Sequence, residues 1–168
     1  MRNWTATSLA MILCLGMNSP AGAGRNDYQI SVGGAPMSCQ TWRGQPVRIV
    51  QNPAVNTLGR AYSTNEGQPI IELNPGGMGT FSPKVQQWWF AHECAHHQLP
   101  PQLNSEKRAD CVAVKRVKRE TGGLNVTEAM SFVRELNGVQ GSAFGHLPGP
   151  ERAKHVLKCA GYELATQA

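Results

Sequence analysis

Two histidines and a glutamate stand at a spacing that suits metal-assisted hydrolysis. Residues 92–96 read His-Glu-Cys-Ala-His. On a helix, side chains four residues apart lie on one face, so His92 and His96 could bind one metal ion together. Glu93 points about 100° away around the helix, which places its carboxylate beside the metal. From there it could take a proton from a metal-bound water, whose pKa the metal lowers, to give a hydroxide nucleophile.

A catalytic zinc ion usually has three protein ligands and one open position, so a third ligand is needed. Residues 104–110 read Asn-Ser-Glu-Lys-Arg-Ala-Asp, in which Glu106 and Asp110 are again four apart. We expect Glu106 to be the third ligand of one Zn²⁺ per chain. Asp110 could accept the outer N–H of a ligand histidine and fix its tautomer. The alternatives are a structural histidine pair and ordinary surface carboxylates.

Helices must position these residues. The sequence predicts helices at about residues 82–98, 104–122, 125–138 and 150–160. Ser82 can cap the first helix, with Pro83 at its first position, and Pro100 and Pro101 prevent its continuation. The Gly122-Gly123 pair ends the second helix.

Short runs with β-strand propensity precede the helices, at residues 45–50, 59–63 and 69–73. Glycine, proline and asparagine separate these runs, which predicts tight turns and a small antiparallel sheet. A small sheet followed by a helical subdomain is an α+β fold.

The start of the chain is typical of a secretory signal peptide at residues 1–23. Arg2 precedes an apolar run over residues 9–17, and Ala21-Gly22-Ala23 fits the cleavage pattern. The apolar run is about half of the roughly 20 residues that a spanning helix needs. We therefore expect an exported protein, periplasmic or secreted, with residues 24–168 forming a single domain. The alternative is an uncleaved membrane anchor. The net charge of +5 is modest and does not indicate a nucleic-acid partner.

Four cysteines lie outside the predicted signal peptide: Cys39, Cys94, Cys111 and Cys159. An even number in an exported chain suggests two disulfides, for which three pairings are possible. We favour Cys94–Cys111, because the helices that carry them must pack together to build the metal site. That choice leaves Cys39–Cys159. Metal binding by cysteines is the alternative, but the chain has no C-x-x-C spacing.

Two further histidines are interpreted as structural or supporting residues. His97 adjoins a predicted ligand but faces about 100° away from it, so we expect a surface or supporting position. His155 lies on the last predicted helix, and we assign it a structural position.

The pattern H-E-x-x-H followed by E-x-x-A-D resembles the gluzincins, the thermolysin-like zinc metallopeptidases. Its short spacing is most similar to minimal soluble relatives of the CAAX prenyl protease type peptidases. The resemblance touches most of residues 58–155. Residues 61–73 are similar to the strand–turn–strand segment ahead of the family's active-site helix. In that family the edge strand of the sheet holds the substrate backbone. Residues 145–152 are similar to the family's His-Pro segment followed by an arginine.

The resemblance implies a minimal zincin-like fold and a role for each motif residue. His92, His96 and Glu106 would be the zinc ligands, Glu93 the general base, and His146 or Arg152 the group that stabilises the oxyanion. The chain departs from the family in two respects: Leu147 separates His146 from the following proline, and the membrane helices of the prenyl proteases are missing.

These observations predict a zinc metallopeptidase that hydrolyses peptide bonds in a peptide or protein substrate, without stable membrane insertion. Because the chain is short, a protein partner could complete its cleft. One alternative is a zinc amide hydrolase acting on the cell wall. Another is a zinc-containing binding protein without turnover, for which a Glu93→Gln change would have no effect.

Overall fold

The computed structural model describes residues 27–141 and 145–162, and the predicted signal peptide lies outside them. Along the chain the elements are β1 (Gln29–Val32), β2 (Ala35–Ser38), β3 (Arg48–Gln51), β4 (Gly59–Ser63), β5 (Pro69–Leu73), α1 (Pro75–Met78), α2 (Pro83–Gln98), the 3-10 turn η1 (Pro101–Leu103), α3 (Glu106–Glu120), α4 (Val126–Leu136) and α5 (Gly149–Cys159). Small sheets followed by helices confirm the predicted α+β class.

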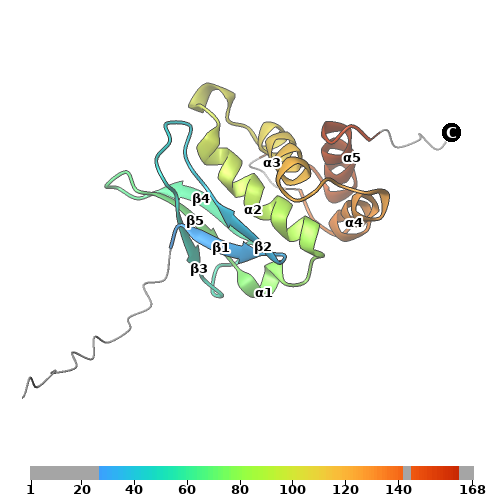
Figure 1. The fold of residues 1–168 in the computed structure, drawn as a ribbon, viewed down its shortest axis with the longest axis horizontal. Helices are drawn as coiled ribbons and strands as arrows, with labels where there is room; N and C mark the ends of the chain where they lie inside the picture. The colour runs from blue at the N-terminus through green and yellow to red at the C-terminus, as the bar shows by residue number, and fades with distance from the viewer. Residues whose placement is uncertain (1–26, 142–144, 163–168) are drawn as a thin grey trace, which may run out of the picture.

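The helix α2 lies between the β layer and the other helices (Figure 1). It contacts β1, β4 and β5 on one side, and α3 and α4 on the other. α5 packs against α3 and α4. A residue on α2 can therefore reach either the sheet or the helical layer, depending on its position around the helix axis.

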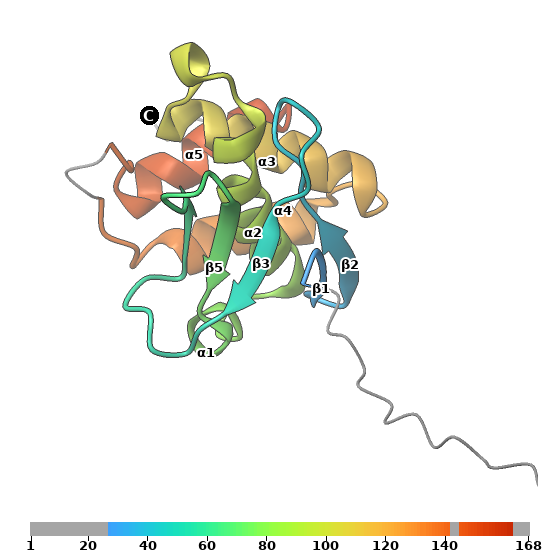
Figure 2. The same cartoon turned by 90° about the vertical axis from the view of Figure 1, so that its left-hand side faces the viewer.

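The three-stranded sheet has the order β3-β5-β4 and is mixed, which corrects the antiparallel sheet that we expected. β4 and β5 form an antiparallel pair, whereas β3 runs parallel to β5. The difference arises because the segment 52–58 carries the chain past the position that β5 later fills, so β3 and β4 are not neighbours. Figure 2 views this sheet from its outer face, with α2 behind it. β5 is buried along its whole length, and β4 lies at one edge of the sheet.

A second sheet, the hairpin of β1 and β2, was not predicted from the sequence. Its turn is Gly33-Gly34, with φ values of 54° and 77°. Positive φ at both central residues is typical of the tight hairpin turns that glycine pairs favour. The Gly-Gly pair between two short apolar runs was therefore the signal that could have revealed it.

The helix boundaries follow the predicted start and stop signals closely. Ser82 and Pro83 begin α2, but the Ser82 hydroxyl makes no capping bond and instead lies 3.3 Å from the hydroxyl of Ser131. Ser105 caps α3 by accepting a hydrogen bond from the Arg108 amide. Asn125 begins α4 with both bonds of a capping box.

The core forms where α2 meets its neighbours on both sides. The side chains of Trp88, Phe90 and Ala91 on α2 are fully buried. The core residues contributed by the other elements include Ile71, Ala113, Val114, Val117, Phe132, Leu136, Val156 and Leu157. Within residues 27–141 and 145–162, no helix has the length and apolarity needed to cross a membrane.

The disulfides join Cys39 to Cys94 and Cys111 to Cys159, so the pairing that we favoured is wrong. α2 and α3 do pack together, as that argument required. However, Cys94 lies about 200° around α2 from His92 and faces the end of β2. Cys111 lies about 100° from Asp110 and faces α5. Cys111 therefore points away from the α2–α3 contact, whereas the Cys94 sulfur still lies 3.1 Å from Nη1 of Arg116 on α3 but bonds to Cys39.

The start of α5 allows a test of this packing, because a Cβ atom placed on Gly149 would lie 1.7 Å from the Leu136 carbonyl oxygen. We predict that Gly149→Ala lowers the free energy of unfolding by about 3 kcal/mol, since backbone would have to move. Gly138→Ala is the matched control, as nothing lies within 4 Å of its Cβ position. Urea unfolding measures both variants, and equal midpoints would contradict the described contact between α4 and α5.

Candidate metal centre

Helices α2 and α3 bring the three predicted ligands to one point. His92 and His96 lie on one face of α2, with their Nε2 atoms 3.2 Å apart. Glu106, the first residue of α3, places Oε2 3.1 Å from the Nε2 of His92 and Oε1 3.5 Å from the Nε2 of His96. One candidate ligand atom from each residue lies within 4.8 Å of the others. The predicted set is therefore assembled as expected.

The donor set fits a zinc ion. Two imidazole nitrogens and one carboxylate oxygen are a common set of three protein ligands at a zinc site with an open position. The Oε2 atom of Glu106 is buried, and no hydrogen bond of regular geometry reaches it, although nitrogens of His92 and His146 lie 3.1 and 2.6 Å away. A buried carboxylate oxygen needs a partner. A cation between these side chains would supply it.

His92 is held in the tautomer that metal binding requires. Its Nδ1 lies 2.8 Å from the Oδ1 of Asp110. Arg152 Nη2 lies 3.2 Å from the same nitrogen, but a guanidinium can only donate, so it cannot bond a protonated Nδ1. With the proton on Nδ1 directed to Asp110, Nε2 carries the lone pair that a metal would bind, and Nη2 of Arg152 also lies 3.3 Å from this atom. Asp110 thus occupies the supporting position that the sequence predicted.

His96 is oriented by Asn104, whose role the sequence analysis missed. The His96 Nδ1 lies 2.8 Å from the Oδ1 of Asn104, and the Asn104 amide donates to the His96 carbonyl at 3.1 Å. The same amide group therefore fixes both the ring and the backbone of this ligand. The sequence predicts only a helix start at Asn104. A short polar residue between the two motif halves was the available signal.

Arg152 supports the centre from α5. Its Nη2 and Nε atoms lie 2.7 and 3.0 Å from the two carboxylate oxygens of Asp110. Its guanidinium carbon lies 4.9 Å from the ring centre of Trp88 and 4.6 Å from that of Trp89. The side chain is 1% exposed. The buried charge of Arg152 is therefore compensated by the Asp110 carboxylate and by stacking on two tryptophan rings, which is how a protein tolerates a buried charge.

Glu93 lies beside the ligands and is mostly buried. It lines the same cleft as His92 and His96. The strand β4 passes close to it, since a Cβ atom on Gly59 would lie 3.0 Å from the Cγ of Glu93. Burial raises the pKa of this carboxyl above its ordinary value, although His92 and His96 act in the opposite direction. A glutamate with a raised pKa beside a metal site is suited to proton transfer.

His146 approaches the centre from the segment before α5. Its Nε2 lies 2.6 Å from the Oε2 of Glu106, and its ring centre lies 5.7 Å from that of His92. It is partly exposed and lines the cleft with Glu93. The additional Leu147 in the motif thus does not prevent His146 from reaching the site.

Neighbouring charges control protonation here. Burial disfavours the charged form of His92, but Asp110 and Glu106 outweigh burial and raise its pKa. Burial opposes ionisation of Glu106 too, yet the surrounding imidazoles of His146, His92 and His96 hold the pKa of this carboxyl well below its usual range. Metal ions bind the neutral imidazole, so binding must displace protons from these histidines.

The centre opens into a cleft of about 470 Å³. Residues 59–63 of β4 form one wall, and residues of the metal centre form the floor. His97 borders the cleft but turns to the sheet, where its Nε2 lies 3.0 Å from the Ile70 carbonyl oxygen. Burial lowers the pKa of His97. Its supporting position agrees with our expectation.

We compared the chain with protein-family models, with curated proteins and with solved structures, and none of them matched it.

The contact of Asp110 with His92 can be tested by substitution. We predict that Asp110→Asn weakens zinc binding by about 10- to 100-fold, because a neutral amide polarises the imidazole less. Glu120→Gln is the matched control, since its carboxylate lies on the same helix and binds Arg116 instead. Competition with a chromophoric chelator measures the affinity, and circular dichroism verifies the fold. A folded Asp110→Asn variant with unchanged affinity would show that the contact does not tune the ligand.

Proposed function

We propose that this chain is an exported zinc metallopeptidase of the gluzincin type. The observation that supports this most is the meeting of His92, His96 and Glu106 at one point, with Glu93 buried beside them in an open cleft. Three ligands and an adjacent carboxylate are the parts that zinc-dependent hydrolysis needs. The family resemblance of the two motif halves agrees with this proposal.

Zinc, when bound here, supplies a Lewis acid that polarises a carbonyl oxygen and lowers the pKa of water. The residues of the chain do the remaining work. Glu93 accepts a proton from the attacking water and passes it to the leaving amine. Its raised pKa brings the carboxyl closer to the pH at which such a transfer in both directions is efficient.

The position of β4 favours a peptide as the substrate. This strand lies at an edge of the described sheet and forms one wall of the cleft. An extended peptide could pair with its free backbone groups as an added strand, which would bring a peptide carbonyl across the metal centre. Such pairing recognises backbone and is less suited to a cell-wall amide that lacks an extended strand.

Of the two residues considered for oxyanion stabilisation, we assign His146 to this role. Arg152 is almost fully buried and uses both Nε and Nη2 on Asp110, so it acts as a positioning residue. His146 is partly exposed in the cleft, close to Glu106. A donor aimed at developing negative charge typically contributes strongly to the rate.

Export is part of the proposal. The predicted signal peptide lies outside the described residues. The disulfides are compatible with an oxidising compartment such as the periplasm or the exterior of the cell.

We predict that Glu93→Gln abolishes most turnover of a quenched peptide library but leaves zinc bound. The amide cannot accept a proton, and loss of such a group typically costs about 10²–10⁴ in kcat. The exposed Glu151→Gln provides the matched control. Zinc-loaded wild type without turnover on peptides would exclude the peptidase. Turnover on cell-wall amides alone would then indicate the other hydrolase, and no turnover on either would indicate a zinc-containing binding protein.

We predict that His146→Ala lowers kcat about 10²-fold and leaves KM and zinc content near those of wild type. Arg152→Lys should instead weaken zinc binding, because a lysine cannot bond both oxygens of Asp110. Steady-state kinetics together with zinc titration separate the two effects. A His146 variant with unchanged kcat would remove this residue from the mechanism.

A further inference from the structure

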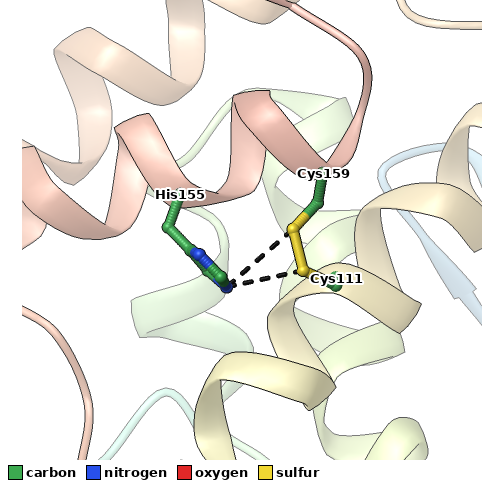
Figure 3. Close-up of side chains that lie close together, drawn as sticks. All are labelled: Cys111, His155 and Cys159. Carbon is green, nitrogen blue, oxygen red and sulfur yellow. Dashed lines mark hydrogen bonds between the residues drawn. A yellow bond between two sulfur atoms is a disulfide. The ribbon is translucent and has the colours of Figure 1, made fainter.

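A second group of metal-ligating residues lies between α3 and α5, away from the cleft. Figure 3 shows His155 turned toward the disulfide of Cys111 and Cys159. The His155 Nε2 lies 3.4 Å from the Sγ of Cys111 and 3.9 Å from that of Cys159. One ligand atom from each of the three lies within 4.8 Å of the others. Two sulfurs and one imidazole nitrogen therefore already meet at one place.

The two disulfides of the described chain differ in accessibility. Cys39 and Cys94 are 3% and 0% exposed. Cys111 and Cys159 are only partly buried, and His155 is also partly exposed. A reductant must contact a sulfur atom to attack it, so the Cys111–Cys159 bond is the one open to exchange in the folded protein.

We propose that Cys111, His155 and Cys159 form a second metal site, which binds Zn²⁺ when this disulfide is reduced. A dithiol reductant supplies two electrons and two protons, the S–S bond breaks, and the reductant becomes a disulfide. Each cysteine then loses its proton to solvent as the metal binds, because the thiolate is the ligand. This site takes zinc through sulfur and nitrogen, whereas the cleft takes it through nitrogen and oxygen.

The distances suit tetrahedral coordination. With zinc–sulfur bonds of about 2.3 Å and zinc–nitrogen bonds of about 2.0 Å, a tetrahedral ion holds sulfur and nitrogen about 3.5 Å apart and two sulfurs about 3.8 Å apart. The nitrogen-to-sulfur distances of 3.4 and 3.9 Å bracket the first value. The sulfurs need to separate from about 2 Å to about 3.8 Å, which is less than 1 Å of movement for each.

The helices provide this arrangement without rearrangement of the backbone. His155 and Cys159 are four residues apart on α5 and share one face, as His92 and His96 do on α2. Cys111 faces them from α3, with its Cα atom 5.1 Å from that of Cys159. The His155 Nε2 now lies 2.9 Å from the Lys107 carbonyl oxygen. Since a carbonyl oxygen only accepts, Nε2 carries the ring proton in this contact; metal binding would exchange the contact for a metal bond, with loss of the Nε2 proton to solvent and gain of one at Nδ1.

The location gives this second site a structural consequence. Cys111 follows Asp110 on α3, and His155 lies three residues after Arg152 on α5. A metal ion here would hold α3 to α5 in place of the disulfide and so preserve the contact between Asp110 and Arg152. This inference does not depend on the proposed peptidase activity.

Cobalt is a selective probe, because sulfur ligands give Co²⁺ an intense near-ultraviolet charge-transfer band and the nitrogen and oxygen ligands in the cleft do not. The purified, oxidised protein is reduced without oxygen, alkylation of a sample locates the free thiols, and Co²⁺ is titrated. We expect no band before reduction and a band for about one ion per chain after it. Zinc should then displace the cobalt and remove the band.

Matched histidine variants test the third ligand. His155→Ala should weaken cobalt binding at the sulfur site by at least about 10-fold, while His97→Ala should leave it unchanged. Three results would overturn the proposal: a folded protein in which Cys111 and Cys159 cannot be reduced, a reduced and folded protein without the band, or a His155→Ala variant with wild-type affinity. Each can occur whether or not the protein cleaves peptides.

Discussion

The buried carboxylate of Asp110 joins three helices, and the geometry of the candidate metal centre depends on it. It comes from α3, accepts from His92 on α2 and pairs with Arg152 on α5. Asp110 and Arg152 are both almost fully buried, so either alone would carry a large desolvation penalty. The packing of the three helices is therefore tied to the orientation of His92, the proposed metal ligand.

The charges around the centre also favour a divalent cation. The carboxylates of Glu93, Glu106 and Asp110 all act on His92, and the buried guanidinium of Arg152 pairs with Asp110. Three carboxylates against one guanidinium leave two negative charges when all are ionised, which a divalent ion would balance. Without a cation, protons on the histidines can balance this negative charge, because the neighbouring carboxylates raise the pKa of His92. The proposed zinc affinity and the proton affinity would thus be two responses to the same excess of negative charge.

Much of the site could be predicted from the sequence, because helical spacing alone places His92 with His96 and Glu106 with Asp110. The α+β class and the helix boundaries could be predicted too, because caps, glycines and prolines act within a short segment of the chain. The predictions that were wrong concern contacts between segments that are far apart in the sequence. The direction of β3 depends on where β5 inserts, and the pairing of Cys111 depends on how α3 rotates against α5. Neither is encoded in a short segment, and so a correct expectation that two helices pack still gave the wrong disulfides.

The central claim is that three side chains hold one metal ion, and the metal content of the purified, oxidised protein tests it most directly. Elemental analysis should find about one zinc per chain in the wild type, since three protein ligands suffice for a tight site. Glu106→Ala should lose that zinc while remaining folded. Wild-type protein that contains no zinc and cannot be loaded with it would contradict the account, and the arrangement of His92, His96 and Glu106 would then be a structural contact between two helices.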